Sequence, residues 1–287
     1  MKISAREILE RAQKEGWALG AFNAANIETL KAIVAAANKL RAPVIVESSV
    51  GETDFFGPKN LVDVVKNFRE EFNLPIFINL DHSTSEAKVL LGIEAGYEML
   101  HFDGGYLPYM ENLEITKRIV REAHKKGLLV EAEIDRIGGS SRLHDEDVKE
   151  AQKEGMYTDP DRAAEFVKET KVDTFAAFFG NVHGVYKDEK KLDFDLLRKL
   201  RRAVPCFLSM HGGSGITDEA VKKAIKIGIV KVNINTELRV AFRDALEKMI
   251  ADSQEVAVYK MMPPVIQAVQ DIVETKIKIF GSAGKYA

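Results

Sequence analysis

Residues 76–103 read IFINLDHSTSEAKVLLGIEAGYEMLHFD, and this stretch contains one complete strand–helix–strand unit. Its two apolar runs, 76–82 and 98–103, are typical of buried strands, whereas the apolar residues of the intervening segment, 84–96, recur with a helical period. A helix between two strands carries the chain back to the starting edge of the sheet, so the strands run parallel. The unit therefore predicts an α/β fold with a parallel sheet.

The same alternation extends from this unit toward both ends of the chain. The predicted strands lie at residues 18–23, 43–48, 76–82, 98–103, 128–134, 174–180, 206–212 and 230–235. The helices that follow them are predicted at residues 27–40, 60–72, 84–96, 111–127, 161–170, 193–204, 217–228 and 236–251. Eight such units predict a (β/α)8 barrel, the TIM-barrel fold, rather than an open doubly wound sheet.

Two segments lie outside this regular repeat. Residues 137–159 form a long polar connection after the fifth strand, which we interpret as a functional lid, with an ordinary surface insertion as the alternative. Residues 256–280 predict an extra C-terminal helix that packs on the barrel exterior or on a partner subunit. Because no long Pro-, Gly- or Ser-rich linker divides the chain, we expect residues 1–287 to form a single domain.

Composition excludes several classes of protein. The chain has 287 residues, of which 46% are hydrophobic and 30% are charged, and its net charge of −3 provides no electrostatic case for nucleic acid. No apolar run approaches the roughly 20 residues that span a bilayer, and residues 1–16 lack the apolar core of a signal peptide. The single cysteine, Cys206, excludes an internal disulfide and a cysteine-rich zinc module. We therefore expect a cytoplasmic enzyme without a membrane partner.

Polar residues stand at the carboxyl ends of most predicted strands, which form the edge of a TIM barrel where active sites lie. The residues that this arrangement brings to one rim are Asn23, Asp81, His82, Asp103, Glu131, Glu133, His183, His211, Asn233, Asn235 and Thr236. Such a convergence indicates one functional site.

Three of these residues, His82, His183 and His211, predict a metal centre. Three imidazoles with an open fourth position are typical of catalytic zinc, and nitrogen donors favour zinc or cobalt over magnesium. Each histidine alone would more commonly be a structural residue. The other three histidines receive no metal role: we interpret His101, inside a strand, as packing and His124 as a residue of a helix C-terminal turn, and the role of His144 is open.

An anion site is predicted beside the metal. Gly212, Gly213 and Ser214 follow the seventh strand and the polar segment 233–236 follows the eighth, which is the usual phosphate position in these barrels. Glycine permits close approach of the backbone, and N–H groups at a helix start favour anions. A tight turn without a ligand is the alternative.

Asp81, directly before His82, is the best candidate for a general acid or base. A metal ion close by would keep its carboxylate ionised until substrate arrives. The alternative is that Asp81 only orients a metal ligand.

The motifs that carry these residues, taken in order, resemble those of the class II, metal-dependent ketose-bisphosphate aldolases. They are LDH at 80–82, VEAEIDRIGG at 130–139, GNVHGVY at 180–186, SMHGGSG at 209–215 and VKVNINTEL at 230–238. The resemblance extends from AFN at 21–23 to KIKIFGS at 276–282, which is nearly the whole chain. The main members of this family act on fructose and tagatose bisphosphates.

The resemblance implies roles residue by residue. It implies that the three histidines bind zinc, that Asp81 is the catalytic acid and base, and that Glu133 helps hold the metal in an alternate position. The residues that it implies for substrate binding are Asn23, Gly184, Gly212, Gly213, Ser214, Asn233, Asn235 and Thr236. It also implies a sugar bisphosphate as substrate, a monovalent cation (Na+ or K+) near the phosphate, and a homodimer or homotetramer.

The chain departs from the family pattern in the connection after the fifth strand. Ser140 and Ser141 stand where the family usually has a glutamate, so we expect Glu146 or Asp145 to supply the second acid. The group that binds the distal phosphate stays open.

Several activities remain open within this reading. We expect cleavage of fructose 1,6-bisphosphate, and Asn235 slightly favours fructose over tagatose. Tagatose 1,6-bisphosphate, another phosphorylated ketose, and a barrel that binds metal or sugar phosphate without turnover are the alternatives. A Schiff-base mechanism is disfavoured because Lys231 begins its strand, at the end of the barrel away from the site.

Overall fold

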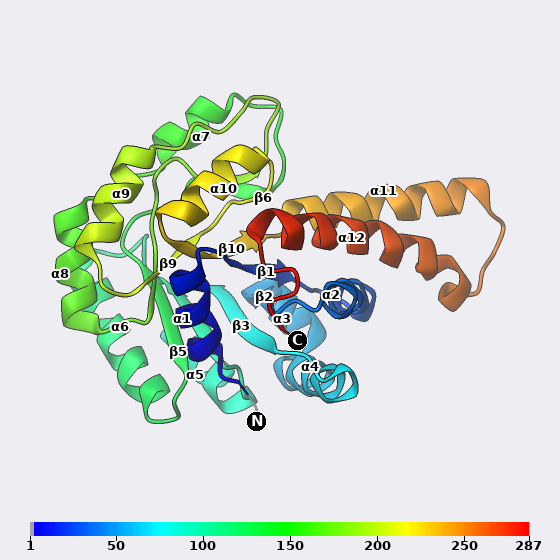
Figure 1. Ribbon diagram of the computed structural model, residues 1–287, viewed down its shortest axis with the longest axis horizontal. Helices are drawn as coiled ribbons and strands as arrows, with labels where there is room; N and C mark the ends of the chain where they lie inside the picture. Colours follow the sequence, from blue (N-terminus) through cyan, green and yellow to red (C-terminus); the bar gives the residue numbers. More distant parts are fainter. Residues whose placement is uncertain (1–2, 287) are drawn as a thin grey trace.

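The computed structural model describes residues 3–286, in which eight parallel strands close into a barrel (Figure 1). The first strand pairs with both the second and the last, and this pairing closes the ring. In order around the barrel, the strands are β1 (Leu19–Asn23), β10 (Ile229–Ile234), β9 (Phe207–Met210), β7 (Thr174–Ala176), β5 (Leu129–Glu133), β4 (Met99–Asp103), β3 (Ile76–Ser83) and β2 (Val44–Ser49). The predicted (β/α)8 barrel is confirmed.

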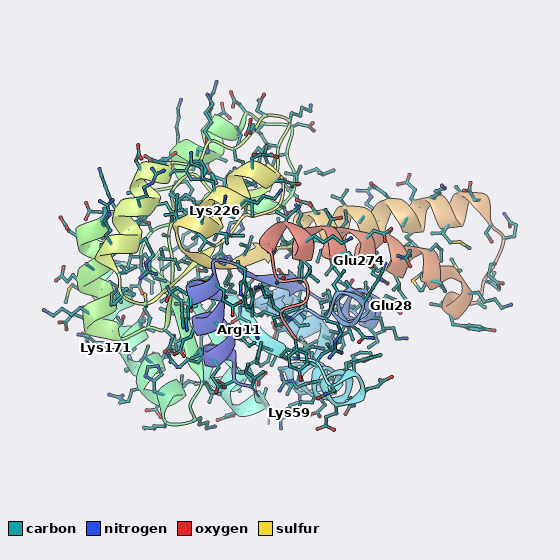
Figure 2. All side chains as sticks on the ribbon, in the orientation of Figure 1. Arg11, Glu28, Lys59, Lys171, Lys226 and Glu274 are labelled. Atoms are coloured by element: carbon teal, nitrogen blue, oxygen red, sulfur yellow. The ribbon has the colours of Figure 1, made fainter. Side chains whose placement is uncertain are left out.

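Helices alternate with the strands and cover the outside of the barrel (Figure 1). They are α1 (Ala5–Glu15), α2 (Ile27–Leu40), α3 (Val50–Phe56), α4 (Pro58–Phe72), α5 (Glu86–Ala95), α6 (Tyr109–His124), α7 (Val148–Glu154), α8 (Pro160–Thr170), α9 (Phe194–Ala203), α10 (Asp218–Ile227), α11 (Thr236–Asp252) and α12 (Val258–Phe280). Charged side chains such as Lys59, Lys171 and Lys226 lie on this outer layer (Figure 2). Within residues 3–286, no helix is long and apolar enough to cross a membrane.

The first helix, α1, closes the amino-terminal end of the barrel. It begins with a capping box between Ser4 and Glu7, and it buries Ile8 and Leu9 completely. These side chains pack against residues at the starts of the strands, including Phe77 of β3 and Met99 of β4. Among the described residues, this packing fills the amino-terminal end of the barrel, and a cavity lies at the opposite, carboxyl-terminal end of the strands.

Residues 137–159 are more ordered than the predicted polar connection. Strand β6 (Gly139–Leu143) pairs in parallel with β8 (His183–Val185), and helix α7 follows. The predicted strand at 174–180 is correspondingly shorter, because only β7 pairs within the barrel before the chain turns toward β8. The error has a physical origin: β6 is polar and half exposed, so its residues carry no apolar periodicity.

The last two helices form a hairpin that projects from the barrel beside α2 (Figure 1). The predicted C-terminal helix is confirmed as α12, which contains Pro263 and Pro264 in its early turns. Large apolar side chains near the tip of the hairpin, Ile250, Val256 and Tyr259, are exposed.

Candidate active site

The carboxyl-terminal rim of the barrel contains a small cavity in which the sequence-predicted residues meet. It is lined by Asn23, Asp81, His82, Ser141, His183, Gly184, His211, Gly212, Ser214, Asn233, Asn235 and Thr236. Every residue of this set except Ser141 was predicted as a catalytic, metal-binding or substrate-binding residue. Gly213 lies directly beside the cavity, where its N–H donates to the carbonyl oxygen of Asn233 at 3.2 Å.

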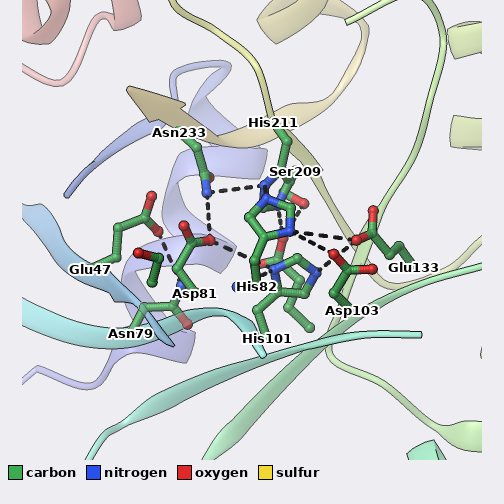
Figure 3. A network of polar contacts seen from close by, with 12 residues as sticks. Glu47, Asn79, Asp81, His82, His101, Asp103, Glu133, Ser209, His211 and Asn233 are labelled. Carbon is green, nitrogen blue, oxygen red and sulfur yellow. Dashed lines mark hydrogen bonds and ion pairs between the residues drawn. The ribbon is translucent and has the colours of Figure 1, made fainter. Parts of the chain in front are cut away.

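The predicted metal-binding histidines converge on His82. The centroid of its ring lies 4.5 Å from that of His211 and 4.8 Å from that of His183. Atoms of Asp81, His82, His101 and His211 that could hold a metal all lie within 4.8 Å of one another (Figure 3). The predicted ligand His183 lies outside this group, and its ring centroid is 6.0 Å from that of His211. The positions of the four grouped side chains fit a metal ion.

Hydrogen bonds fix the tautomers of two histidines so that both direct a lone pair to the same point. His211 donates from Nε2 to the Glu131 carboxylate at 2.6 Å, and His82 donates from Nδ1 to Asp103 at 3.1 Å. The remaining nitrogens, His82 Nε2 and His211 Nδ1, lie 2.8 Å apart. Two facing lone pairs repel each other unless a proton lies between them or a cation to one side binds both nitrogens. This chemistry fits a metal ligand set with carboxylates behind it.

The protonation states agree with a cation site. Burial and the proximity of His82 lower the pKa of His211 to about 3, and burial lowers the pKa of His183 well below its usual value. Burial also disfavours charge on His82, but the carboxylates of Asp81, Asp103 and Glu133 outweigh it and raise its pKa well above the usual value. The three carboxylates thus favour a positive charge at His82, which a metal cation would supply in place of the proton, and burial keeps the other two imidazoles neutral.

His82 is held in an unusual backbone conformation. Its φ is 45°, in the left-handed region, and the pairing of β3 with β4 shifts between Leu80 and Ser83. This bulge re-aims the His82 side chain, and the His82 N–H donates to His101 Nδ1 at 3.2 Å. His101 therefore stabilises the strained backbone of a candidate metal ligand.

Interpreting His101 as simple packing was wrong. It is fully buried inside the barrel, its Nδ1 lies 3.7 Å from Asp81, and its Nε2 lies 3.7 Å from Glu133. The sequence contained a signal for this position. Met99, His101 and Asp103 alternate along β4, so their side chains share one face of the strand. Because Met99 packs against α1 at the end of the barrel interior, the other two also face the interior.

An ionic network lies beneath the metal-binding rim. Lys231 is fully buried and contacts Glu131 at 2.7 Å and Glu47 at 3.5 Å. Burial lowers the pKa of Lys231, but the two carboxylates outweigh it and raise the pKa above the usual value. Its amine is therefore protonated, which disfavours a Schiff base at Lys231.

Asp81 is placed and charged as a base would be. It accepts hydrogen bonds from the amides of Asn23 and Asn233, both at 3.2 Å. Burial alone would raise the pKa of Asp81, but the nearby imidazoles of His82, His101 and His211 hold it well below the usual value. The carboxylate is thus ionised. Two amide N–H groups orient it, and an amide does not transfer its proton to a carboxylate.

Glu133 and Asp103 form a second possible metal-binding group with His82. His82 Nδ1 lies 3.6 Å from Glu133, and the buried Glu133 Oε2 has no hydrogen-bond partner among the described residues. Burial and the neighbouring Asp103 raise the pKa of Glu133 well above its usual value, whereas the hydrogen bond from His82 helps to lower that of Asp103 despite burial. A cation here would occupy the unused carboxylate oxygen.

The predicted loop acids lie apart from this group. Asp145 is exposed and contacts Lys187 at 2.8 Å, while Glu146 contacts His144 at 3.0 Å. Glu146 lines a neighbouring cavity with His144 and Tyr186, and neither acid is among the described residues that line the cavity of Asp81. Ser141 is the residue of this segment that reaches that cavity.

A larger cavity, of about 210 Å³, opens beside the metal-binding rim and has one cationic residue that sequence reasoning missed. Arg239 lines it together with Ser140 and Ser141, donates to the Ser141 carbonyl oxygen at 3.2 Å, and contacts Glu52 at 2.5 Å. The sequence analysis did not select Arg239 because it lies within a predicted helix and not at a strand end. It nevertheless follows Thr236 by three residues, which places both on the same helix face.

Comparisons with known proteins agree with this geometry. Residues 3–285 match the family model for fructose-bisphosphate aldolase class-II. The chain belongs to the class II fructose-bisphosphate aldolase family. Class II aldolases depend on a metal ion, and the fit of the rim to a cation is consistent with this membership.

Relatives of this class II aldolase cover the whole chain. A fructose-bisphosphate aldolase of Geobacillus stearothermophilus is 37% identical over 99% of both chains. The crystal structure of the YdjI aldolase from Escherichia coli K12 matches with a TM-score of 0.86 and 30% identity, covering 100% of each chain. A putative fructose-1,6-bisphosphate aldolase from Coccidioides immitis matches with a TM-score of 0.87 and 27% identity, covering 98% of this chain and 97% of that one.

Replacing Glu131 with glutamine should weaken metal binding by about 10- to 100-fold, because the carboxylate that fixes the His211 tautomer is lost. It should also lower the melting temperature, because Lys231 loses its closest carboxylate. Metal competition with a chelating dye and thermal unfolding measure the two effects. Glu122→Gln on the surface is the matched control, and unchanged metal affinity in Glu131→Gln would show that Glu131 does not act through His211.

Proposed function

We propose that this class II aldolase reversibly cleaves fructose 1,6-bisphosphate to dihydroxyacetone phosphate and glyceraldehyde 3-phosphate, with zinc as its metal. The observation that carries the proposal is the single cavity in which three imidazoles and the ionised Asp81 adjoin glycine turns suited to a phosphate. The name of the relative from Geobacillus stearothermophilus supports the choice of substrate.

His82, His183 and His211, which line one cavity, would hold the metal, and Glu133, which is grouped with His82 and Asp103, would hold it in an alternate position. When bound, Zn²⁺, or Co²⁺ in its place, would supply a Lewis acid that stabilises the negative charge developing on the substrate. The protein keeps two of the imidazoles neutral by burial and fixes two tautomers with Glu131 and Asp103.

Asp81 would accept the proton of the substrate's C4 hydroxyl during cleavage and return it during condensation. Its ionised state and its two amide donors, Asn23 and Asn233, prepare it for this role. After cleavage the remaining carbanion must also receive a proton at carbon. Glu146 or Asp145 would supply it if the segment from β6 to α7 moves over the cavity, with Gly138 and Gly139 as its hinge.

The two phosphates would lie on opposite sides of the metal. Gly184, Gly212, Gly213 and Ser214 would contact the phosphate of the dihydroxyacetone half, together with Asn235 and Thr236 at the start of α11. Gly212 has φ of 63°, and a Cβ there would lie 2.2 Å from the Val182 carbonyl oxygen, so this turn requires glycine. Arg239, at the larger cavity, would contact the distal phosphate.

We also infer a homodimer or homotetramer. The projecting hairpin of α11 and α12 exposes Ile250, Val256, Val258 and Tyr259 near its tip, and burying such apolar surface in a partner subunit would be favourable. The substrate is a small sugar phosphate, and neither a membrane nor a nucleic acid is needed.

The purified protein should release triose phosphates from fructose 1,6-bisphosphate faster than from tagatose 1,6-bisphosphate. A chelator should abolish the activity, and Zn²⁺ or Co²⁺ should restore it, because the charge on the substrate then has no other strong stabiliser. A coupled assay with both bisphosphates measures this. Full activity in metal-free protein would contradict the proposed chemistry, and proton exchange of dihydroxyacetone phosphate without cleavage would indicate another phosphorylated ketose. Binding without any turnover would identify a non-catalytic barrel.

Replacing Asp81 with alanine should reduce cleavage by roughly 100-fold or more, the scale expected on losing a general acid and base. Metal content should stay unchanged, because the three imidazoles remain. Turnover assays and metal analysis separate the two effects, with exposed Asp195→Ala as the control. Loss of metal together with activity would instead make Asp81 a support for the metal ligands.

Amide variants of the loop acids test the second proton donor. Glu146→Gln or Asp145→Asn should slow proton exchange at the carbon of dihydroxyacetone phosphate by roughly 100-fold while metal binding is retained. Asp147→Asn is a matched control, because Asp147 caps α7 and asparagine caps equally well. Wild-type exchange rates in all three variants would place the acid elsewhere, with His144 the next candidate, because Glu131 is held ionised by Lys231.

A further inference from the structure

One buried lysine near the cavity has no role in the proposed chemistry. Lys190 lies in the charged run KDEKK at 187–191, yet its side chain is buried with 2% exposed, whereas Lys187 and Lys191 on either side are exposed. A buried ammonium is costly unless it is paired or fully hydrogen-bonded, so its surroundings must compensate the charge.

Main-chain oxygen atoms surround the Lys190 ammonium. Nζ donates to the carbonyl oxygens of Gly184 at 2.6 Å, of Gly212 at 2.9 Å, and of Ser214. Each hydrogen bond that the structure gives Nζ within residues 3–286 ends on a carbonyl and not on a carboxylate. Three acceptors match the three N–H groups of an ammonium, whereas a neutral amine has only two.

This arrangement is the ligand set of a hard monovalent cation, with Nζ at its centre. Carbonyl oxygens from separate turns replace the hydration shell of alkali ions in proteins. Here strand β8 supplies one oxygen and the turn after β9 supplies two, and all three are directed to one point that the Lys190 ammonium fills. A free Na+ or K+ cannot occupy the same point.

The carbonyl-bearing residues also form the wall of the substrate cavity. Gly184, Gly212 and Ser214 all line it, whereas Lys190 contacts their carbonyl oxygens from the side away from the cavity and is not a lining residue. Burial lowers the pKa of Lys190 to about 7, while Glu237 acts in the opposite direction. A dianionic phosphate against this wall would stabilise the ammonium, and the ammonium would in turn attract the phosphate.

We propose that the Lys190 ammonium is a built-in replacement for the monovalent cation that the resemblance implies near the phosphate. It ties strand β8 to the turn after β9 and supplies the positive charge behind the phosphate subsite, so this aldolase needs neither Na+ nor K+. The link to phosphate rests on the proposed function, whereas the replacement of a free cation rests only on the carbonyl cage.

The proposal predicts different cation responses in the wild type and in Lys190→Ala. In buffer with choline as its sole cation, the wild type should keep its KM for fructose 1,6-bisphosphate and its melting temperature when K+, Na+ or NH4+ is added. Lys190→Ala should show a KM about 10- to 100-fold higher, the range expected on losing a charged donor, with kcat changed less. K+, Na+ or NH4+ should partly restore its KM and raise its melting temperature.

Lys191→Ala is the matched control, because Lys191 is adjacent and exposed. A wild-type enzyme that requires Na+ or K+, or a Lys190→Ala variant whose melting temperature and KM ignore these ions, would overturn the proposal. The melting temperatures test the cage even if neither bisphosphate is a substrate, so failure of the proposed function stays distinguishable. If Lys190→Ala does not fold, the cation response of the wild type still decides, since a dependence on Na+ or K+ refutes the proposal and full independence supports it.

Discussion

Lys231 and Glu131 form an ion pair of 2.7 Å inside the barrel, and the candidate metal ligands lie directly above it. The pair is almost completely buried, so neither charge would be tolerated without the other. The second oxygen of Glu131 accepts hydrogen bonds from Ser209 and His211, both at 2.6 Å. Glu131 is thereby kept ionised, and its charge fixes which nitrogen of His211 faces the metal position.

The barrel compensates its two buried lysines in different ways, and the difference follows their positions. Lys231 lies beneath the rim, and the carboxylates that contact it neutralise its charge. The lysine therefore adds little positive potential at the imidazoles above it. Lys190 lies behind the substrate cavity and is bound by neutral carbonyl oxygens, so its charge remains available to an anion. In the proposed function, the Lys190 charge would attract a phosphate, and the neutral pair of Lys231 and Glu131 would not repel a metal cation.

The residues of the site differ in how well the sequence predicts their roles. His82, His183, His211 and Asp81 were found because polar side chains at strand ends stand out against apolar runs. His101 was misread because a histidine within a strand also suits packing, and only the inward face of β4 brings it to Asp81. Arg239 and the pairing of β6 with β8 were missed because neither interrupts or creates a periodic pattern.

The sequence by itself determined the barrel, its strand order and the rim at which the site lies. Parallel strands joined by helices can close in few ways, and polar residues at their carboxyl ends must then meet. The tertiary structure alone decided which groups touch: the tautomers set by Asp103 and Glu131, and the carbonyl cage around Lys190. These depend on distances of a few ångströms between residues far apart along the chain, and periodicity carries no information about such distances.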